Sequence, residues 1–132
     1  MEMIHVQSGK RNELIDINGM VEDIVRKSGI EEGICTVYAP HATCGIMINE
    51  NYDPNICLDI TELLTDLVPQ GKWRHDQIDG NADSHIKASI VGPSETIPFL
   101  KGKLLLGTWQ SIMLADFDGP RERKIVVKVI EG

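Results

Sequence analysis

Apolar residues recur with two different periods along the chain, and the change of period separates strands from helices. Stretches rich in Ile, Val and Thr with near-alternating polarity predict strands. They cover residues 3–8, 12–15, 33–39, 44–50, 95–100, 103–106, 108–117 and 121–130. Helical spacing predicts helices over residues 17–28, 54–67 and 84–91. Because strands dominate both ends and no repeat is visible, we expect a single α+β domain over residues 1–132 with a large antiparallel component.

The segment 54–67 is predicted to be an amphipathic helix. Asp53 suits the N-cap, and Pro54 fits the first turn because its missing N–H would have no helical partner there. The apolar stripe comprises Ile56, Ile60, Leu63, Leu64 and Leu67. Carboxylates lie away from this stripe, so the helix should present one apolar and one acidic face.

A polar loop follows this helix and carries two histidines, His75 and His85. Asp83 is placed to cap a short helix starting at Ser84. His85 would then lie in the first turn, where the helix dipole disfavours protonation of the ring. A neutral imidazole at such a place can bind a metal ion or accept a proton.

His41 is the third candidate, because it follows a strand and a proline and should lie at a strand end. Three imidazoles with one open position suit zinc rather than magnesium. We therefore predict a metal site of His41, His75 and His85. Their spacing matches no short zinc motif, so separate surface or hydrogen-bonded histidines remain the alternative.

Two further groups could complete such a site. Glu50 ends an apolar strand and could act as a general base or orient a metal-bound histidine. In the last strand, alternation places Arg121 and Arg123 on the same face as core residues. The two guanidinium groups predict either an anion site or a buried ion pair with Asp or Glu.

Charge and composition narrow the class of protein. The chain has 132 residues and a net charge of −7, which argues against a nucleic-acid partner. Charged residues interrupt every apolar run before the roughly 18 residues needed to cross a membrane. The N-terminus lacks the layout of a secretion signal, so we expect a cytoplasmic protein.

The three cysteines, Cys35, Cys44 and Cys57, include no Cys-x-x-Cys pair. They are interpreted as buried small hydrophobes, with a thiol ligand or nucleophile as the alternative.

Taken together, several short motifs resemble the YjbQ-like family. They are His41-Ala42-Thr43, Ile48-Asn49-Glu50-Asn51, His75, His85-Ile86-Lys87-Ala88-Ser89, Gly107-Thr108-Trp109-Gln110 and Asp118-Gly119-Pro120-Arg121-Glu122-Arg123. The resemblance covers nearly the whole chain in one order. It implies an α+β fold of two packed, mainly antiparallel sheets with two to three helices, assembled as a homotrimer.

The resemblance also implies a function. Family members are described as uncharacterised or as having secondary thiamine-phosphate synthase activity, which joins a pyrimidine diphosphate to a thiazole phosphate. On this basis we expect a metal-dependent enzyme acting on small phosphorylated substrates. His75, His85 and Glu50 would be catalytic, and Arg121 and Arg123 would bind the anion. The alternative is a non-enzymatic trimer that binds a metal ion or a small anion.

Overall fold

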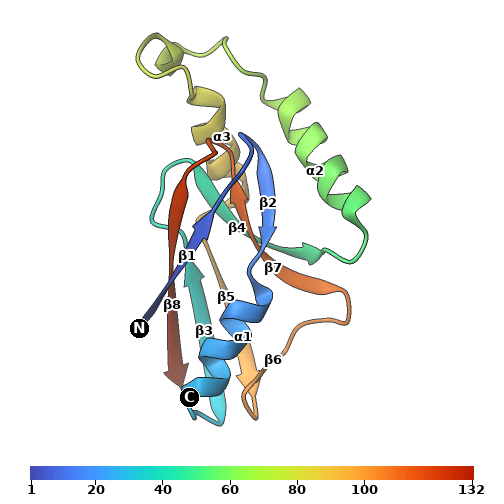
Figure 1. Ribbon diagram of the computed structural model, residues 1–132, viewed down its shortest axis with the longest axis vertical. Coiled ribbons are helices and arrows are strands. Elements are labelled where there is room, and N and C mark those ends of the chain that lie inside the picture. The colour runs from blue at the N-terminus through green and yellow to red at the C-terminus, as the bar shows by residue number, and fades with distance from the viewer.

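Two antiparallel sheets form the framework of the molecule, and the computed structural model describes residues 1–132 (Figure 1). The first sheet has the strand order β1-β8-β3-β5-β6, and the second has the order β2-β7-β4. The strands are β1 (Glu2–Gln7), β2 (Glu13–Asp16), β3 (Glu32–Tyr38), β4 (Cys44–Glu50), β5 (Ser94–Leu100), β6 (Lys103–Leu104), β7 (Gln110–Asp116) and β8 (Glu122–Glu131). The helices are α1 (Asn18–Lys27), α2 (Pro54–Leu67), the 3-10 helix η1 (Arg74–Gln77) and α3 (Ala82–Val91). The predicted α+β class with two antiparallel sheets is confirmed.

The core lies between the two sheets and is closed by α1. In β3, residues alternate between buried and exposed, so Cys35 and Val37 face the core while Glu32 and Tyr38 face solvent. From the second sheet, β4 and β7 contribute Ile46 and Leu114, both fully buried. Burial of this kind contributes about 25 cal/mol for each square ångström of apolar surface and dominates the stability of the fold.

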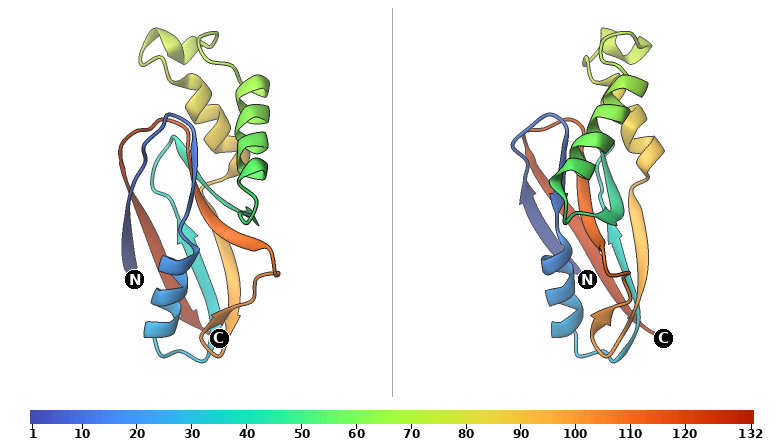
Figure 2. Two further views of the ribbon diagram at one scale, coloured as in Figure 1. Left: turned by 45° about the vertical axis from the view of Figure 1, so that its right-hand side comes forward. Right: turned by 90° about the vertical axis from the view of Figure 1, so that its right-hand side faces the viewer.

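Helices α2, η1 and α3 project beyond one end of the sheets and form a lobe (Figure 2). Helix α2 begins as predicted, because the Asp53 carboxylate accepts a hydrogen bond from the Asn55 N–H at 2.9 Å. Its apolar stripe is only partly covered, since Leu64 is buried but Leu63 and Leu67 are exposed. The amphipathic pattern therefore predicted the helix correctly. Leu64 and Ile60 pack in a small cluster with Ala88, Ala115 and Phe117, and the rest of the apolar face is uncovered.

Helix α3 starts two residues earlier than predicted, at Ala82, and ends at Val91, before Gly92, whose φ is +92°. Asn81 takes the N-cap position, so the prediction that Asp83 caps this helix is wrong. The Asp83 side chain instead turns inward and is buried against Arg11 and Lys87. None of the helices is both long and apolar enough to span a membrane.

Candidate functional site

His75 and His85 lie side by side in a hollow of the lobe. Their ring centroids are 4.8 Å apart, with the planes inclined at 78° in an edge-to-face arrangement. The hollow has a volume of about 540 Å³ and is lined by Lys72, Trp73, Arg74, His75, Ala82, His85 and Ile86. The structure thus brings together two of the three predicted histidines.

Asp76 links the two segments that carry these two rings. Its carboxylate accepts hydrogen bonds from the Trp73 N–H at 2.9 Å and from the Ala82 N–H at 3.0 Å. These backbone hydrogen bonds hold the pKa of Asp76 below its usual value. Asp76 therefore joins η1 to the start of α3.

The indole of Trp73 is fixed as well. Its Nε1–H donates to the Pro69 carbonyl oxygen at 2.7 Å, and the Lys72 ammonium lies 5.0 Å above the ring. Lys72 and Arg74 are the hollow's cations, and sequence reasoning missed both. The run Lys-Trp-Arg-His at residues 72–75 was the available signal, because basic and aromatic side chains alternate there.

The Nε2 atom of His75 is buried and has no hydrogen-bond partner. The nearest carboxylate oxygen, Oδ2 of Asp79, is 3.5 Å away without hydrogen-bond geometry. A buried polar nitrogen without a partner costs free energy, and such atoms in native proteins commonly mark a functional site. This nitrogen lacks a hydrogen-bond partner within the chain, and its burial keeps it from solvent.

His41 lies apart from the pair, on the loop between β3 and β4. Its Nε2 atom is 3.0 Å from both the backbone N and the backbone O of Lys124 on β8. Burial lowers the pKa of His41, the hydrogen bond to Lys124 opposes that change, and the charge of Arg123 lowers the pKa further. The net effect favours a neutral ring.

The three-histidine site is consequently not assembled within one chain. No group of three or more His, Cys, Asp or Glu side chains is arranged to hold a metal ion. The His75–His85 pair suits a transition metal such as zinc, but a zinc site in a protein takes at least three protein ligands. One chain therefore brings together only two of the three predicted histidine ligands.

The two arginines differ in their environments. Arg123 is buried, as the alternation in β8 predicts, and it donates to both carboxylate oxygens of Asp116, at 2.7 and 3.0 Å. Thr43 accepts a further hydrogen bond from this guanidinium at 2.9 Å. Arg121 is more exposed and lies 3.3 Å from Asp118. For Arg123 the ion-pair alternative is correct. Arg121 lies before β8 and its side chain is 56% exposed, so the prediction that it shares the core face is wrong. Its guanidinium donates to the carbonyl and carboxylate oxygens of Asp118, and anion binding by Arg121 stays a prediction.

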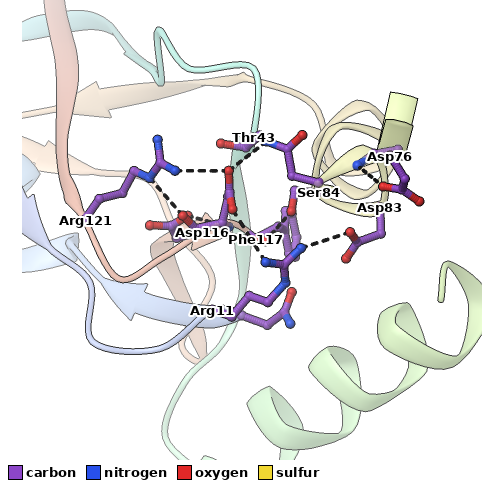
Figure 3. Close-up of polar contacts among 12 residues, drawn as sticks. Arg11, Thr43, Asp76, Asp83, Ser84, Asp116, Phe117 and Arg121 are labelled. Atoms are coloured by element: carbon purple, nitrogen blue, oxygen red, sulfur yellow. Dashed lines mark hydrogen bonds and ion pairs between the residues drawn. The ribbon is translucent and has the colours of Figure 1, made fainter. Parts of the chain in front are cut away.

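A second cluster of buried charges was not predicted. Arg11 reaches from the β1–β2 loop to Asp83 on α3 at 3.1 Å (Figure 3). The Lys87 ammonium, one turn further along α3, lies 3.2 Å from the same carboxylate. Spacing of four residues suggests a helical pair, but a sequence carries no sign that such a pair is buried. This cluster fixes α3 against the N-terminal strands.

Glu50 lies at the end of β4 from which the chain enters α2 (Figure 1). Helix α2 has 14 residues and spans about 21 Å before the chain reaches the hollow. Within one chain, Glu50 therefore does not lie beside His75 and His85.

The three cysteines are free, and the two in the strands are buried. Burial raises the pKa of Cys35 to about 11 and contributes most to raising that of Cys44 to about 12. Both thiols therefore stay protonated at neutral pH, which disfavours a ligand or nucleophile role and agrees with the prediction of small buried hydrophobes.

Comparison with known proteins gives consistent matches over the whole chain. A family model described as "UPF0047 protein YjbQ-like" matches residues 2–132. A UPF0047 protein of Methanocaldococcus jannaschii is 46% identical over 125 residues, covering 95% of this chain and 90% of the relative. The UPF0047 protein YugU of Bacillus subtilis is 38% identical over 133 residues, covering 98% of each chain.

Solved structures agree with the fold. A YjbQ/UPF0047 family protein of Clostridium acetobutylicum superposes with a TM-score of 0.95 at 42% identity, covering 98% of this chain and 100% of that one. A protein of Sulfolobus solfataricus, described as YbjQ-like and of unknown function, also gives a TM-score of 0.95, at 39% identity, and the match covers 99% of this chain and 96% of that one. The arrangement of two sheets and a helical lobe is therefore common to these proteins.

Proposed function

The chain belongs to the YjbQ-like UPF0047 family, and from this membership and the geometry of the hollow we propose that it binds a divalent metal ion together with a small phosphorylated ligand. The observation that carries the proposal is the unpartnered, buried Nε2 of His75 beside the ring of His85. Imidazole nitrogens favour zinc over magnesium, which prefers carboxylates and water. When bound, the metal would supply a Lewis acid next to the ligand.

The charge of the residues that line the hollow supports the proposal of a phosphorylated ligand. Lys72 and Arg74 line it with the two histidines, and no carboxylate is among the lining residues, although Asp79 lies 3.5 Å from the His75 ring. In a chain with a net charge of −7, a locally basic hollow favours an anionic ligand. The guanidinium of Arg74 can bind a phosphate through two N–H groups, and the ammonium of Lys72 adds a point charge.

Replacement of either histidine should remove the metal. We expect His75→Ala and His85→Ala to bind zinc at least about tenfold less tightly than the wild type, because each change removes a ligand of the proposed site. Zinc content after chelator treatment and reloading, measured by mass spectrometry, checks this. His5→Ala is the matched control, because His5 is exposed on β1 and its ring pairs with Glu122, away from the hollow. Equal zinc content in all four proteins would refute the proposal.

A second candidate function is catalytic. The presence of imidazoles and cations in one hollow favours transfer chemistry on a phosphorylated substrate, as in the thiamine-phosphate synthase activity that the resemblance implies. His75 and His85 would hold the metal, and Glu50 would move a proton if the assembled protein brings it to the hollow.

An assay of thiamine-phosphate formation distinguishes the two candidates. Zinc-loaded protein is incubated with the pyrimidine diphosphate and the thiazole phosphate. We expect turnover that His75→Ala abolishes and His5→Ala leaves unchanged. Stoichiometric binding of zinc and inorganic phosphate without turnover would instead identify a non-enzymatic metal- and anion-binding protein.

A further inference from the structure

Three sulfur-containing side chains gather between α2 and the second sheet. Met47 on β4 and Met113 on β7 are directly opposite each other in the antiparallel ladder, so their side chains lie on the same face of the sheet. The thiol of Cys57, near the start of α2, is directed at this face, with Sγ 3.8 Å from Sδ of Met113. We call Cys57, Met47 and Met113 the sulfur cluster. It is separate from the hollow, because none of the three residues lines the hollow.

Packing alone does not require sulfur at these positions. Both methionines have only Ile or Leu as their neighbours in the strand, and the apolar stripe of α2 is otherwise made of Ile and Leu. Met113 is fully buried, whereas Met47 and Cys57 are half-buried. Met47 also lines a groove of about 350 Å³ between α2, α3 and β4, which opens the cluster to solvent. Sulfur on three adjacent elements therefore adds soft lone-pair donors to an apolar layer that can be reached from outside.

The contacts of the Cys57 thiol show where an ion would lie. The thiol has two acceptors for its one proton, Oδ1 of Asn51 at 3.3 Å and Sδ of Met113 at 3.8 Å. A metal ion that replaces this proton would lie between the same atoms. With metal–sulfur bonds of about 2.3 Å, as for metal thiolates, two sulfurs 3.8 Å apart subtend an angle of about 110° at the ion. This angle suits a three-coordinate ion, and Met47 lies on the same face as a third donor.

Charge around the sulfur cluster favours a cation. Burial raises the pKa of Cys57 most, and the negative charges of Asp16 and Asp53 raise it further. The same two charges that hold the proton on the sulfur also favour another positive ion in its place. Asp16 is kept near by a hydrogen bond of 2.7 Å from the Asn51 amide. No Lys or Arg occurs in residues 28–71, which include β4 and α2, so cations of the same segment do not oppose such an ion.

From these observations we infer that the sulfur cluster is a binding site for monovalent copper, with the Cys57 thiolate and the Met113 thioether as ligands and Met47 as the third sulfur donor. Thiolate and thioether ligands select Cu(I), whereas zinc sites are built from thiolates, imidazoles and carboxylates. Binding exchanges one Cu(I) ion for the thiol proton, which is released to solvent, and no electron is transferred. One thiolate neutralises one monovalent ion, so the half-buried site gains no net charge, whereas Zn²⁺ would leave an unbalanced positive charge there. This site is independent of the function proposed for the hollow.

Anaerobic titration with Cu(I) tests the inference. The full-length protein competes for copper with the colorimetric chelator bicinchoninate, and ascorbate keeps the copper reduced. We expect the wild type to bind Cu(I) and to develop the ultraviolet charge-transfer absorption of a Cu(I)–thiolate bond. Cys57→Ser should lose this absorption, and Met113→Leu should bind Cu(I) at least about tenfold less tightly than the wild type. Met20→Leu is the matched control, because Met20 is 46% exposed on α1, and it should bind Cu(I) like the wild type.

The two proposed metal sites are distinguished by zinc. Cys57→Ser should keep the zinc affinity of the wild type, and His75→Ala should keep the Cu(I)–thiolate absorption. Three results would overturn the inference: a wild type that binds no Cu(I), thiolate absorption that persists in Cys57→Ser, and a Cu(I) affinity that Met113→Leu leaves unchanged. Met113→Leu roughly conserves side-chain volume, and circular dichroism checks its fold. If it does not fold, Met47→Leu at the half-buried position repeats the test, with the same loss of affinity expected.

Discussion

Arg123→Met is expected to destabilise the protein by about 3–5 kcal/mol, because it leaves the Asp116 carboxylate buried without its cation. The Arg123 side chain is 4% exposed and the Asp116 side chain is fully buried. Besides Arg123, the Ser8 hydroxyl and the Asp118 N–H donate to this carboxylate, and neither carries a charge. Equilibrium unfolding in urea, followed by circular dichroism, measures this decrease in the free energy of unfolding.

The double variant Arg123→Met/Asp116→Leu is the control, since removing both charges removes the penalty of an unpaired ion. It should be more stable than Arg123→Met.

Dependence of stability on pH gives a second check. Burial alone would raise the pKa of Asp116, but hydrogen bonds from Arg123, Asp118 and Ser8 outweigh it, and the net pKa lies below the usual 3.8.

A lowered pKa in the folded state means that the pair stabilises the protein fully above the unfolded pKa of about 3.9. That contribution is lost as the pH falls through the folded value. The wild type should therefore lose more stability between pH 7 and pH 3 than the double variant does. Equal acid sensitivity of the two proteins would show that the pair contributes little.

The inward position of Arg123 could be predicted because side chains in a strand alternate between two faces, and Ile125 and Val127 on the same face are core residues. Alternation does not identify the partner. Asp116 comes from β7 of the other sheet, and only the packing of the two sheets brings the two charges together. The sequence therefore left two interpretations open, and the tertiary structure decided between them.

The histidines show a second limit of sequence reasoning. His75 and His85 are separated by one short loop that Asp76 closes, so their proximity follows from local structure. His41 is far from them along the chain, and sequence spacing carries no information about its distance from them in space. Apolar periodicity has a similar limit in α2, because it predicts an apolar face but cannot say whether the same chain or another one covers it.

These two unexplained features, the incomplete ligand set and the uncovered apolar face, lie next to each other in the lobe. Consistency between local pattern and overall fold is the rule in natural proteins, and exceptions tend to mark functional sites. In this chain both exceptions involve residues of α3. The position of that helix therefore decides whether the proposed site can form.

Asp83→Asn is expected to be the most damaging change to the anchoring of α3, at about 3–5 kcal/mol, because it leaves a buried ammonium without its carboxylate. The Asp83 and Lys87 side chains are only 1% and 2% exposed. After the change, Lys87 keeps a hydrogen bond to Asn12 at 3.2 Å but loses its counter-charge. Arg11 loses the same partner, although it still lies 3.7 Å from Asp118.

Lys87→Met provides the matched comparison from the same cluster. Asp83 then retains Arg11 at 3.1 Å, so we expect a smaller loss, about 1.5–3 kcal/mol, which is typical of one hydrogen bond to a charged group. Urea unfolding of both variants tests this order. A larger loss for Lys87→Met would mean that Arg11 does not satisfy the buried carboxylate and that Lys87 anchors α3 alone.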